Sequence, residues 1–263
     1  GLRSHTMFRV NSALFGCLAQ AMNGAASAAS SVYVLYYLRG KRPNGGEDLC
    51  IEGLSVGYGA RNFADGLDAV YYVAQENYPV EFAEMEFGLE IEQFSVHCDS
   101  GGAGRYRGGC GIVRDVRVLL DEMTLGIRID NCRYPAFGTN GGTSGMPGGV
   151  IINPGTAEER RIKPLSDGTV VKKGDLIRII TPGGGGWGSP LDRPQQDVLD
   201  DVLDGYVSIK QAKNQYGVVL SKEGLAIDFS ETKKLRASRP RATEMFHRGE
   251  YYNAEDDRTP QNQ

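Results

Sequence analysis

The residue types that most often carry metal or redox chemistry are scarce in this sequence. Its 263 residues include three histidines and five cysteines, and no two cysteines form a Cys-x-x-Cys pair. An odd number of widely separated cysteines argues against a disulfide framework and against a structural zinc site. We therefore expect a reducing, cytoplasmic location and no metal or other cofactor bound by this chain.

Long apolar runs and a strong charge of either sign are also missing. No apolar run approaches the ~20 residues that a membrane-spanning helix needs. The formal net charge is −4, so nothing in the composition indicates a basic surface for nucleic acid or anionic lipid. We expect neither nucleic acid nor a membrane as a partner.

Glycine, by contrast, is abundant. The chain has 36 glycines, roughly twice the average usage. They concentrate in three stretches, at Asp99–Gly111, Gly138–Gly149 and Thr181–Pro190. Because glycine suits turns and close backbone approach, this composition favours strands joined by turns over a helical bundle.

The apolar patterning predicts an α+β fold with an N-terminal helix, a β-rich core with glycine-rich loops and a C-terminal helical segment. Residues 8–78 read as a helix (8–23) followed by an irregular segment that has a β-like run at Val32–Leu38 and a polar loop at Arg39–Asp48. Residues 79–190 read as the β-rich core. Its predicted strands are Ile91–Cys98, Gly111–Leu119, Met123–Asp130, Gly149–Asn153, Arg160–Pro164 and Asp175–Thr181.

After Pro190 the spacing of the apolar residues changes from strand-like to helical. Residues 191–239 read as a helical segment with a short strand pair at Gly217–Leu220 and Leu225–Phe229. Ser208 and Gln211 form a capping-box pattern at the start of its second helix. Residues 240–263 read as a polar tail, either an arm or disordered.

The glycine stretches have two interpretations. As phosphate cradles they need a P-loop, which is absent, or a Gly-x-Gly-x-x-Gly fingerprint that leads from a strand directly into a helix. That glycine spacing occurs at residues 183–188, but Pro190 and Pro194 separate it from the helix that follows. The alternative, structural turns, is favoured.

Within the first stretch, a glycine frame surrounds two arginines. Arg105 and Arg107, together with the backbone of Gly101, Gly102 and Gly104, are the candidate substrate-binding residues, since rigidly held guanidinium groups bind carboxylate or phosphate. In the alternative interpretation the arginines pair with nearby acidic residues and close the loop. The candidate acids are Asp99, Glu81 and Asp115.

Histidine offers one further candidate for chemistry. His97 falls in a predicted strand, whereas His5 and His247 lie near the chain ends. His97 is either a ligand or proton shuttle, or a structural residue, and the second interpretation is favoured. No catalytic residue is assigned.

The motifs at Asp99–Gly111 and Thr181–Pro190 closely resemble the hydantoinase B/oxoprolinase family, which includes 5-oxoprolinase and subunits of acetone and acetophenone carboxylases. A third motif, Asn77–Glu81, has Tyr78 where the family has Thr, and Ser189 stands where the family has Asp. The segment Val198–Gly217 also follows a family pattern.

The resemblance implies that residues 1–239 correspond to the C-terminal half of a family subunit, so that the chain begins mid-subunit. It also implies partners: the N-terminal half, which carries the Asp/His-rich segments associated with a divalent metal, and a hydantoinase A-like subunit that binds ATP. The complete complex would then be a hetero-oligomer that acts on a small molecule.

Three functions remain open. The leading one is part of an ATP-dependent hydrolase that opens a hydantoin- or oxoproline-like ring. The second is a subunit of an ATP-dependent ketone carboxylase of the acetone or acetophenone type. The third is a non-catalytic assembly fragment, and the isolated chain is expected to be inactive in every case.

Overall fold

The computed structural model describes residues 4–249 except 33, 72–75 and 222–225. Three features of the sequence analysis therefore lie outside the described residues: the tail beyond residue 249, Leu225 of a predicted strand, and the side chain of His5. Within the described part, no helix is long and apolar enough to cross a membrane.

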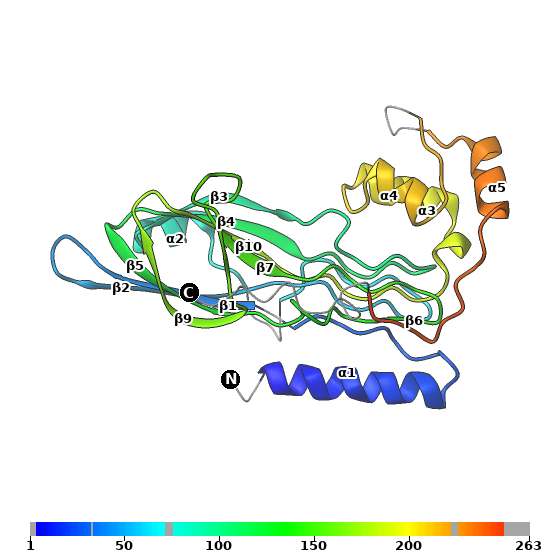
Figure 1. The fold of residues 1–263 in the computed structure, drawn as a ribbon, viewed down its shortest axis with the longest axis horizontal. Helices are drawn as coiled ribbons and strands as arrows, with labels where there is room; N and C mark the ends of the chain where they lie inside the picture. Colours follow the sequence, from blue (N-terminus) through cyan, green and yellow to red (C-terminus); the bar gives the residue numbers. More distant parts are fainter. Residues whose placement is uncertain (1–3, 33, 72–75, 222–225, 250–263) are drawn as a thin grey trace.

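Two antiparallel sheets form the body of the molecule (Figure 1). The first has the order β2-β1-β5-β9 and the second β3-β4-β10-β7-β8. The strands of the first are β1 (Val34–Lys41), β2 (Glu47–Leu54), β5 (Glu122–Arg128) and β9 (Leu165–Lys172). Those of the second are β3 (Leu89–Val96), β4 (Ile112–Val118), β7 (Gly149–Ile152), β8 (Arg160–Ile162) and β10 (Leu176–Ile180).

The two sheets share one hydrophobic core. Leu38 and Leu125 of the first sheet and Val116 and Ile177 of the second are all 0% exposed and belong to a single cluster. Because alternate residues of each strand face inward, the sheets pack face to face as a sandwich. The predicted α+β class and β-rich core are confirmed.

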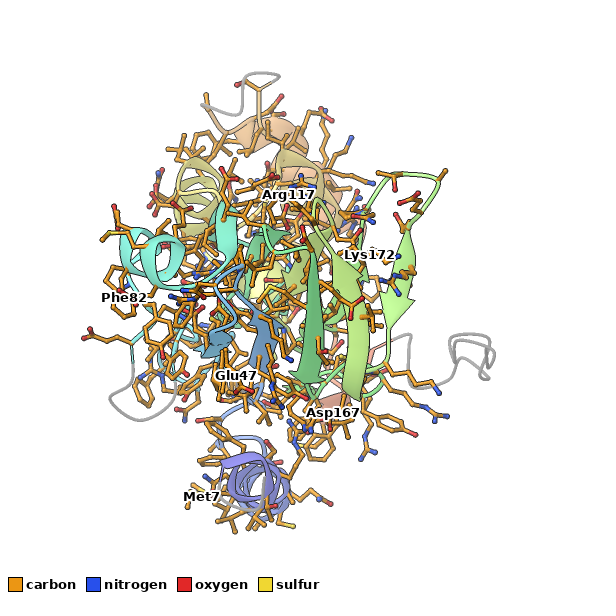
Figure 2. All side chains as sticks on the ribbon, turned by 90° about the vertical axis from the view of Figure 1, so that its left-hand side faces the viewer. Met7, Glu47, Phe82, Arg117, Asp167 and Lys172 are labelled. Atoms are coloured by element: carbon orange, nitrogen blue, oxygen red, sulfur yellow. The ribbon has the colours of Figure 1, made fainter. Side chains whose placement is uncertain are left out.

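Figure 2 views this sandwich from one end, with α2 (Val80–Glu86, marked by Phe82) on one side and β9 (marked by Lys172) on the other. Helix α1 (Ser4–Ala21) runs along the underside, marked by Met7. Relative to the predicted span of 8–23, it begins four residues earlier and ends two residues earlier, and the predicted stop signal Gly24 follows its end, with φ +83° and an N–H that donates to the Ala19 carbonyl at 2.6 Å.

Helix α1 has two different faces. Phe8 and Ala19 are buried, whereas Met7, Val10 and Leu14 are each more than half exposed. These three residues lie at i, i+3 and i+7 and form one apolar stripe. We call it the α1 stripe.

The helical segment lies at the opposite end from β2 and β5 (Figure 1). It comprises a 3₁₀ turn (Pro190–Asp192), α3 (Gln195–Leu203), α4 (Ile209–Asn214) and α5 (Phe229–Ala237). The capping box is confirmed, because the Ser208 hydroxyl accepts the Gln211 N–H at 3.1 Å. Helix α5 was not predicted, although Asp228 caps it through the Glu231 N–H and this spacing is also a capping box.

Several predicted boundaries are wrong. The predicted polar loop at Arg39–Asp48 is too long: the connection spans only residues 42–46, since β1 and β2 pair from Val34↔Leu54 to Lys41↔Glu47. Strand β2 escapes detection because Asp48 and Glu52 face inward while Leu49 and Ile51 are exposed, the reverse of the usual pattern. Partners from elsewhere in the chain bind both inward acids: the Glu52 carboxylate accepts from Tyr36 at 2.7 Å and Arg114 at 3.0 Å, and one oxygen of Asp48 accepts the Gly88 N–H at 2.7 Å.

Other segments have a different type of secondary structure from the one predicted. Helix α2 lies within the predicted β-rich core, and β9 is an exposed edge strand whose polar sequence reads as a turn. The predicted strand pair after Gly217 is a single bridge between Leu220 and Ile227, and Phe229 begins α5. Of the two alternatives for the tail, an arm describes residues 240–249: β11 (Phe246–His247) pairs with β6 (Gly138–Thr139).

The glycine stretches form a separate layer between the sandwich and α3–α5 (Figure 1). Segments 57–60, 101–111, 138–145 and 183–188 run side by side and exchange backbone hydrogen bonds; we call them the glycine bundle. The Gly109 N–H donates to the Tyr58 carbonyl at 2.8 Å, and the Gly184 N–H donates to the Gly109 carbonyl at 2.9 Å.

The bundle has no space for side chains at its contacts. A Cβ on Gly184 would lie 2.1 Å from the Tyr58 carbonyl oxygen, and one on Gly109 would lie 1.9 Å from that of Leu67. Both obstacles are backbone atoms, which cannot rotate away as a side chain can. Glycine is therefore required here by contact between backbones.

We predict that Gly184→Ala destabilises the chain by about 1–3 kcal/mol or more, the usual cost of overpacking a dense interior. The matched control is Gly149→Ala, because a Cβ on Gly149 meets nothing within 4 Å. The free energy of unfolding in urea measures both changes. Equal stabilities of the two variants would contradict the account of the bundle.

Candidate functional site

The two arginines of the glycine frame occupy opposite environments. Arg107 is only 3% exposed. Its guanidinium binds the Asp68 carboxylate through two hydrogen bonds, at 2.7 and 3.1 Å, and Asp201 of α3 at 3.2 Å. One face of the same group lies 4.6 Å from the centroid of the Tyr206 ring. The donors of Arg107 are thus directed to groups of this chain.

A second buried arginine completes this cluster. Arg193 binds both oxygens of Asp65, at 2.7 and 2.8 Å, and lies 2.8 Å from Asp201. The Asp65 carboxylate also accepts the backbone N–H of Arg107 at 2.7 Å. We call Asp65, Asp68, Arg107, Arg193 and Asp201 the arginine–aspartate network; it ties the glycine bundle to α3.

The network keeps its charges in spite of burial. Burial alone would lower the pKa of Arg107, but the hydrogen bonds that it donates to Asp68 and the negative charges around it raise that pKa above its usual value. Burial likewise favours a higher pKa for Asp65, yet the hydrogen bonds and charge of Arg193 outweigh it and hold the pKa below its usual value. For Asp201 burial prevails, and its pKa is raised.

The pairing interpretation of Arg107 is confirmed, but the acids expected for it are wrong. Asp99 instead accepts the Ser208 N–H at 2.7 Å, and Asp115 binds Arg178 at 2.6 and 2.9 Å. Glu81 lies on α2 and forms no ion pair within the described part of the chain. The true partners of Arg107 are 39 and 94 residues away along the chain, so proximity in sequence does not reveal them.

Arg105 differs from Arg107. Its side chain is exposed, and its guanidinium lies 5.7 Å from the centroid of the Tyr106 ring. Its backbone carbonyl accepts a hydrogen bond from Arg193 at 3.2 Å, which anchors the residue to the network. Arg105 is therefore the arginine of the frame that can meet a ligand from solvent, and its contact with substrate stays a prediction.

The backbones of the three glycines proposed to bind substrate together with Arg105 make contacts within the glycine bundle. The Gly102 N–H donates to the Gly184 carbonyl at 2.8 Å, and both Gly102 and Gly104 are buried. Gly101 is half-buried, and a Cβ there would lie 2.0 Å from the Gly108 carbonyl oxygen. These contacts support the interpretation of the glycine stretches as structure over phosphate cradles, because the amide of Gly102 is already bound.

His97 directly follows β3 and is half-buried, and both interpretations of it stay predictions. Its backbone N–H donates to the Gly111 carbonyl at 2.9 Å, and burial lowers the pKa of its imidazole. Among the described residues, no three His, Cys, Asp or Glu side chains are placed to hold a metal ion. The donor groups present here thus do not fit a metal centre.

The sequence also contains a Gly-x-Ser-x-Gly spacing at residues 53–57, which is typical of a nucleophile elbow. That motif requires an exposed serine on a sharp turn between a strand and a helix. Here Ser55 is 3% exposed and leads from β2 to an isolated bridge at Val56↔Val70. The spacing therefore carries no nucleophile.

Together, the glycine bundle and its buried network form a rigid platform built from motifs with a known family pattern. The chain belongs to the Hydantoinase B/oxoprolinase family, whose sequence pattern matches residues 1–190. This match includes the two long glycine motifs and the sandwich, and it ends where the helical segment begins.

Individual relatives agree with this assignment. An uncharacterized protein of Methanocaldococcus jannaschii is 41% identical over 164 residues, covering 61% of this chain and 28% of the relative. A Pseudomonas protein named as a putative D-/L-hydantoinase component is 31% identical over 182 residues, covering 68% of this chain and 30% of the relative. The crystal structure of an ATP-dependent caprolactamase from Pseudomonas jessenii is similar with a TM-score of 0.70 and 27% identity, covering 84% of this chain and 40% of that one.

The aligned regions cover most of this chain but a much smaller share of each relative. The chain aligns with 28% and 30% of the length of the two curated relatives, although most of its own length is matched. It therefore spans less than a third of each of them in the aligned region.

We predict that Arg107→Ala destabilises the chain by about 3–5 kcal/mol, because it removes the arginine partner of the partly buried Asp68 and one of the two arginines that neutralise the buried Asp201. Arg105→Ala serves as the control and changes stability by less than about 0.5 kcal/mol, as is usual at exposed positions. Urea unfolding of the two variants measures both values. Similar losses in the two variants would contradict the contrast drawn between these arginines.

The lowered pKa of Asp65 predicts a dependence of stability on pH. A folded-state pKa below the unfolded value contributes stability that is present above about pH 4 and is lost as the pH falls. We expect Asp65→Asn to be less stable than the original chain at pH 7, with the difference shrinking below pH 4. Urea unfolding between pH 2.5 and 7 measures the difference, and a constant value across that range would refute this role for Asp65.

Proposed function

We propose that this chain is the substrate-side scaffold of an ATP-dependent enzyme that opens a cyclic amide of the hydantoin or oxoproline type. The observation that carries the proposal is the family match over residues 1–190, which includes the glycine motifs that build the bundle. The relative named as a hydantoinase component and the structure of an ATP-dependent caprolactamase support a cyclic-amide substrate.

In this proposal the glycine bundle supplies rigidity. Its segments bind one another through backbone hydrogen bonds, and the arginine–aspartate network fixes them to α3. A group presented from such a platform loses little conformational entropy when it binds a substrate. Arg105 is the group so presented: its guanidinium would steady a negative charge on the substrate or an intermediate.

The proposal includes partner chains. They are a hydantoinase A-like subunit that binds ATP and the region that corresponds to the N-terminal half of a hydantoinase B-like subunit. The α1 stripe supports an assembly, because Met7, Val10 and Leu14 expose a continuous apolar surface that another chain would cover. A cytoplasmic location is consistent with the five free cysteines.

ATP and a divalent metal would be bound by the other parts of the complex. The described residues offer no set of three metal-binding side chains, so we assign no step of the reaction to a metal on this chain. The same observation favours the non-catalytic alternative, in which the chain serves assembly alone. The motifs do not separate a hydrolase from a ketone carboxylase, so the assay includes both substrates.

The proposal is tested on the complex that co-purifies with the chain. Its native mass and metal content are measured, followed by ATP-dependent turnover of hydantoin and 5-oxoproline, and of acetone or acetophenone with bicarbonate. Ring opening that requires ATP supports the hydrolase. Turnover of a ketone and bicarbonate alone would replace it with the carboxylase, and a lone, metal-free 28.6 kDa species without activity would leave the assembly role.

We predict that Arg105→Ala lowers kcat/KM of the active complex by about 10–100-fold, the loss expected for a hydrogen bond to a charged group. Arg39→Ala is the matched control, because Arg39 is also exposed and lies on β1 of the sandwich. Native mass and urea unfolding should be the same for both variants. Unchanged kinetics of Arg105→Ala would remove this residue from the substrate site.

A further inference from the structure

A cavity of about 360 Å³ lies between α1 and the glycine bundle. Its apolar walls come from Phe8 and Phe15 of α1 and from Tyr58 and Leu67 on the opposite side. The rings of Phe8 and Tyr58 meet edge to face, with centroids 6.1 Å apart. The volume is at the lower end of the range for small-molecule sites, so a compact ligand fits it.

A cation lines this apolar cavity without a carboxylate to neutralise it. Arg61 donates to the backbone carbonyl of Asp65 at 2.9 Å and lies 5.4 Å from the centroid of the Phe63 ring. It forms no ion pair with any acidic residue in the described ranges, in contrast to Arg107 and Arg193. A half-buried guanidinium beside aromatic rings is a strong site for an anionic group.

Two further polar side chains line the cavity. Asn11 lies on α1 and Ser27 on the segment that follows it, and both line the cavity. Neither side chain makes a hydrogen bond with another residue of the described chain. Both can donate hydrogen bonds to a carboxylate oxygen.

The floor of the cavity is rigid because it is part of the bundle. The Ala28 N–H donates to the Ala60 carbonyl at 2.8 Å, and the Gly59 N–H donates to the Ser30 hydroxyl at 2.9 Å. Helix α1, which forms another wall of the cavity, is held by an ion pair between Arg9 and Asp130 at 3.0 Å. The cavity is thus present before any ligand binds, which lowers the entropic cost of binding.

We propose that this cavity binds a compact carboxylate with an apolar ring, the carboxylate at Arg61 and the ring against Phe8, Phe15 and Tyr58. The apolar walls favour a planar or cyclic body, and the unneutralised guanidinium favours a single negative charge. This binding is independent of the reaction proposed above, because it needs only this chain and neither ATP nor a partner.

The test uses benzoate as the probe and the full 263-residue chain. Isothermal titration measures its Kd, and benzamide serves as the neutral probe of the same shape. We expect benzoate to bind at least tenfold more tightly than benzamide, and Arg61→Gln to remove that preference. The matched control is Arg39→Gln, which removes an exposed arginine from the sandwich and should leave the Kd unchanged.

A second pair of variants locates the binding. Ser27→Phe fills the cavity and should abolish binding, whereas Ala13→Phe adds the same bulk at an exposed position of α1 that does not line it. Thermal unfolding of each variant confirms that it is folded. The proposal is overturned if benzoate does not bind, if benzamide binds equally well, or if a folded Ser27→Phe variant retains the original Kd.

Discussion

Direct contact between backbones is the constraint on which the rest of this structure depends. In the glycine bundle, carbonyl oxygens occupy the positions where a Cβ would stand, as at Gly184 against Tyr58 and at Gly109 against Leu67. Such close approach allows segments far apart in the sequence to exchange backbone hydrogen bonds at contacts that have no space for a side chain. The network that joins the bundle to α3 and the cavity beneath it both rely on that rigidity.

The arginines around the glycine bundle fall into two groups, which differ in burial and in whether carboxylates neutralise them. Arg107 and Arg193 are nearly covered, and three aspartates neutralise them, because a buried cation without partners would cost several kcal/mol. Arg105 is solvent-exposed, and Arg61 lines an apolar cavity without a carboxylate partner in the described chain. The two buried arginines therefore stabilise the fold, whereas the other two carry charge that a ligand can use.

Much of the fold could be predicted from local patterns. Helix α1 with its stop signal at Gly24, the capping box at Ser208 and the β-rich core all follow from spacing and composition. Strand β2 could not be predicted, because its inward Glu52 is stabilised by Tyr36 and Arg114 from other strands. For the same reason the candidate site was only half predicted: Arg107 was identified, but its partners lie 39 and 94 residues away.

The sequence by itself determined the family, since the glycine motifs are contiguous and their residues are set by backbone geometry that tolerates no side chain. It also determined the α+β class, because strand alternation and helix caps are local. Only the tertiary structure decided which arginine is neutralised, which is exposed and which lines a cavity. Those differences depend on burial and on carboxylates brought from distant segments, which no local pattern encodes.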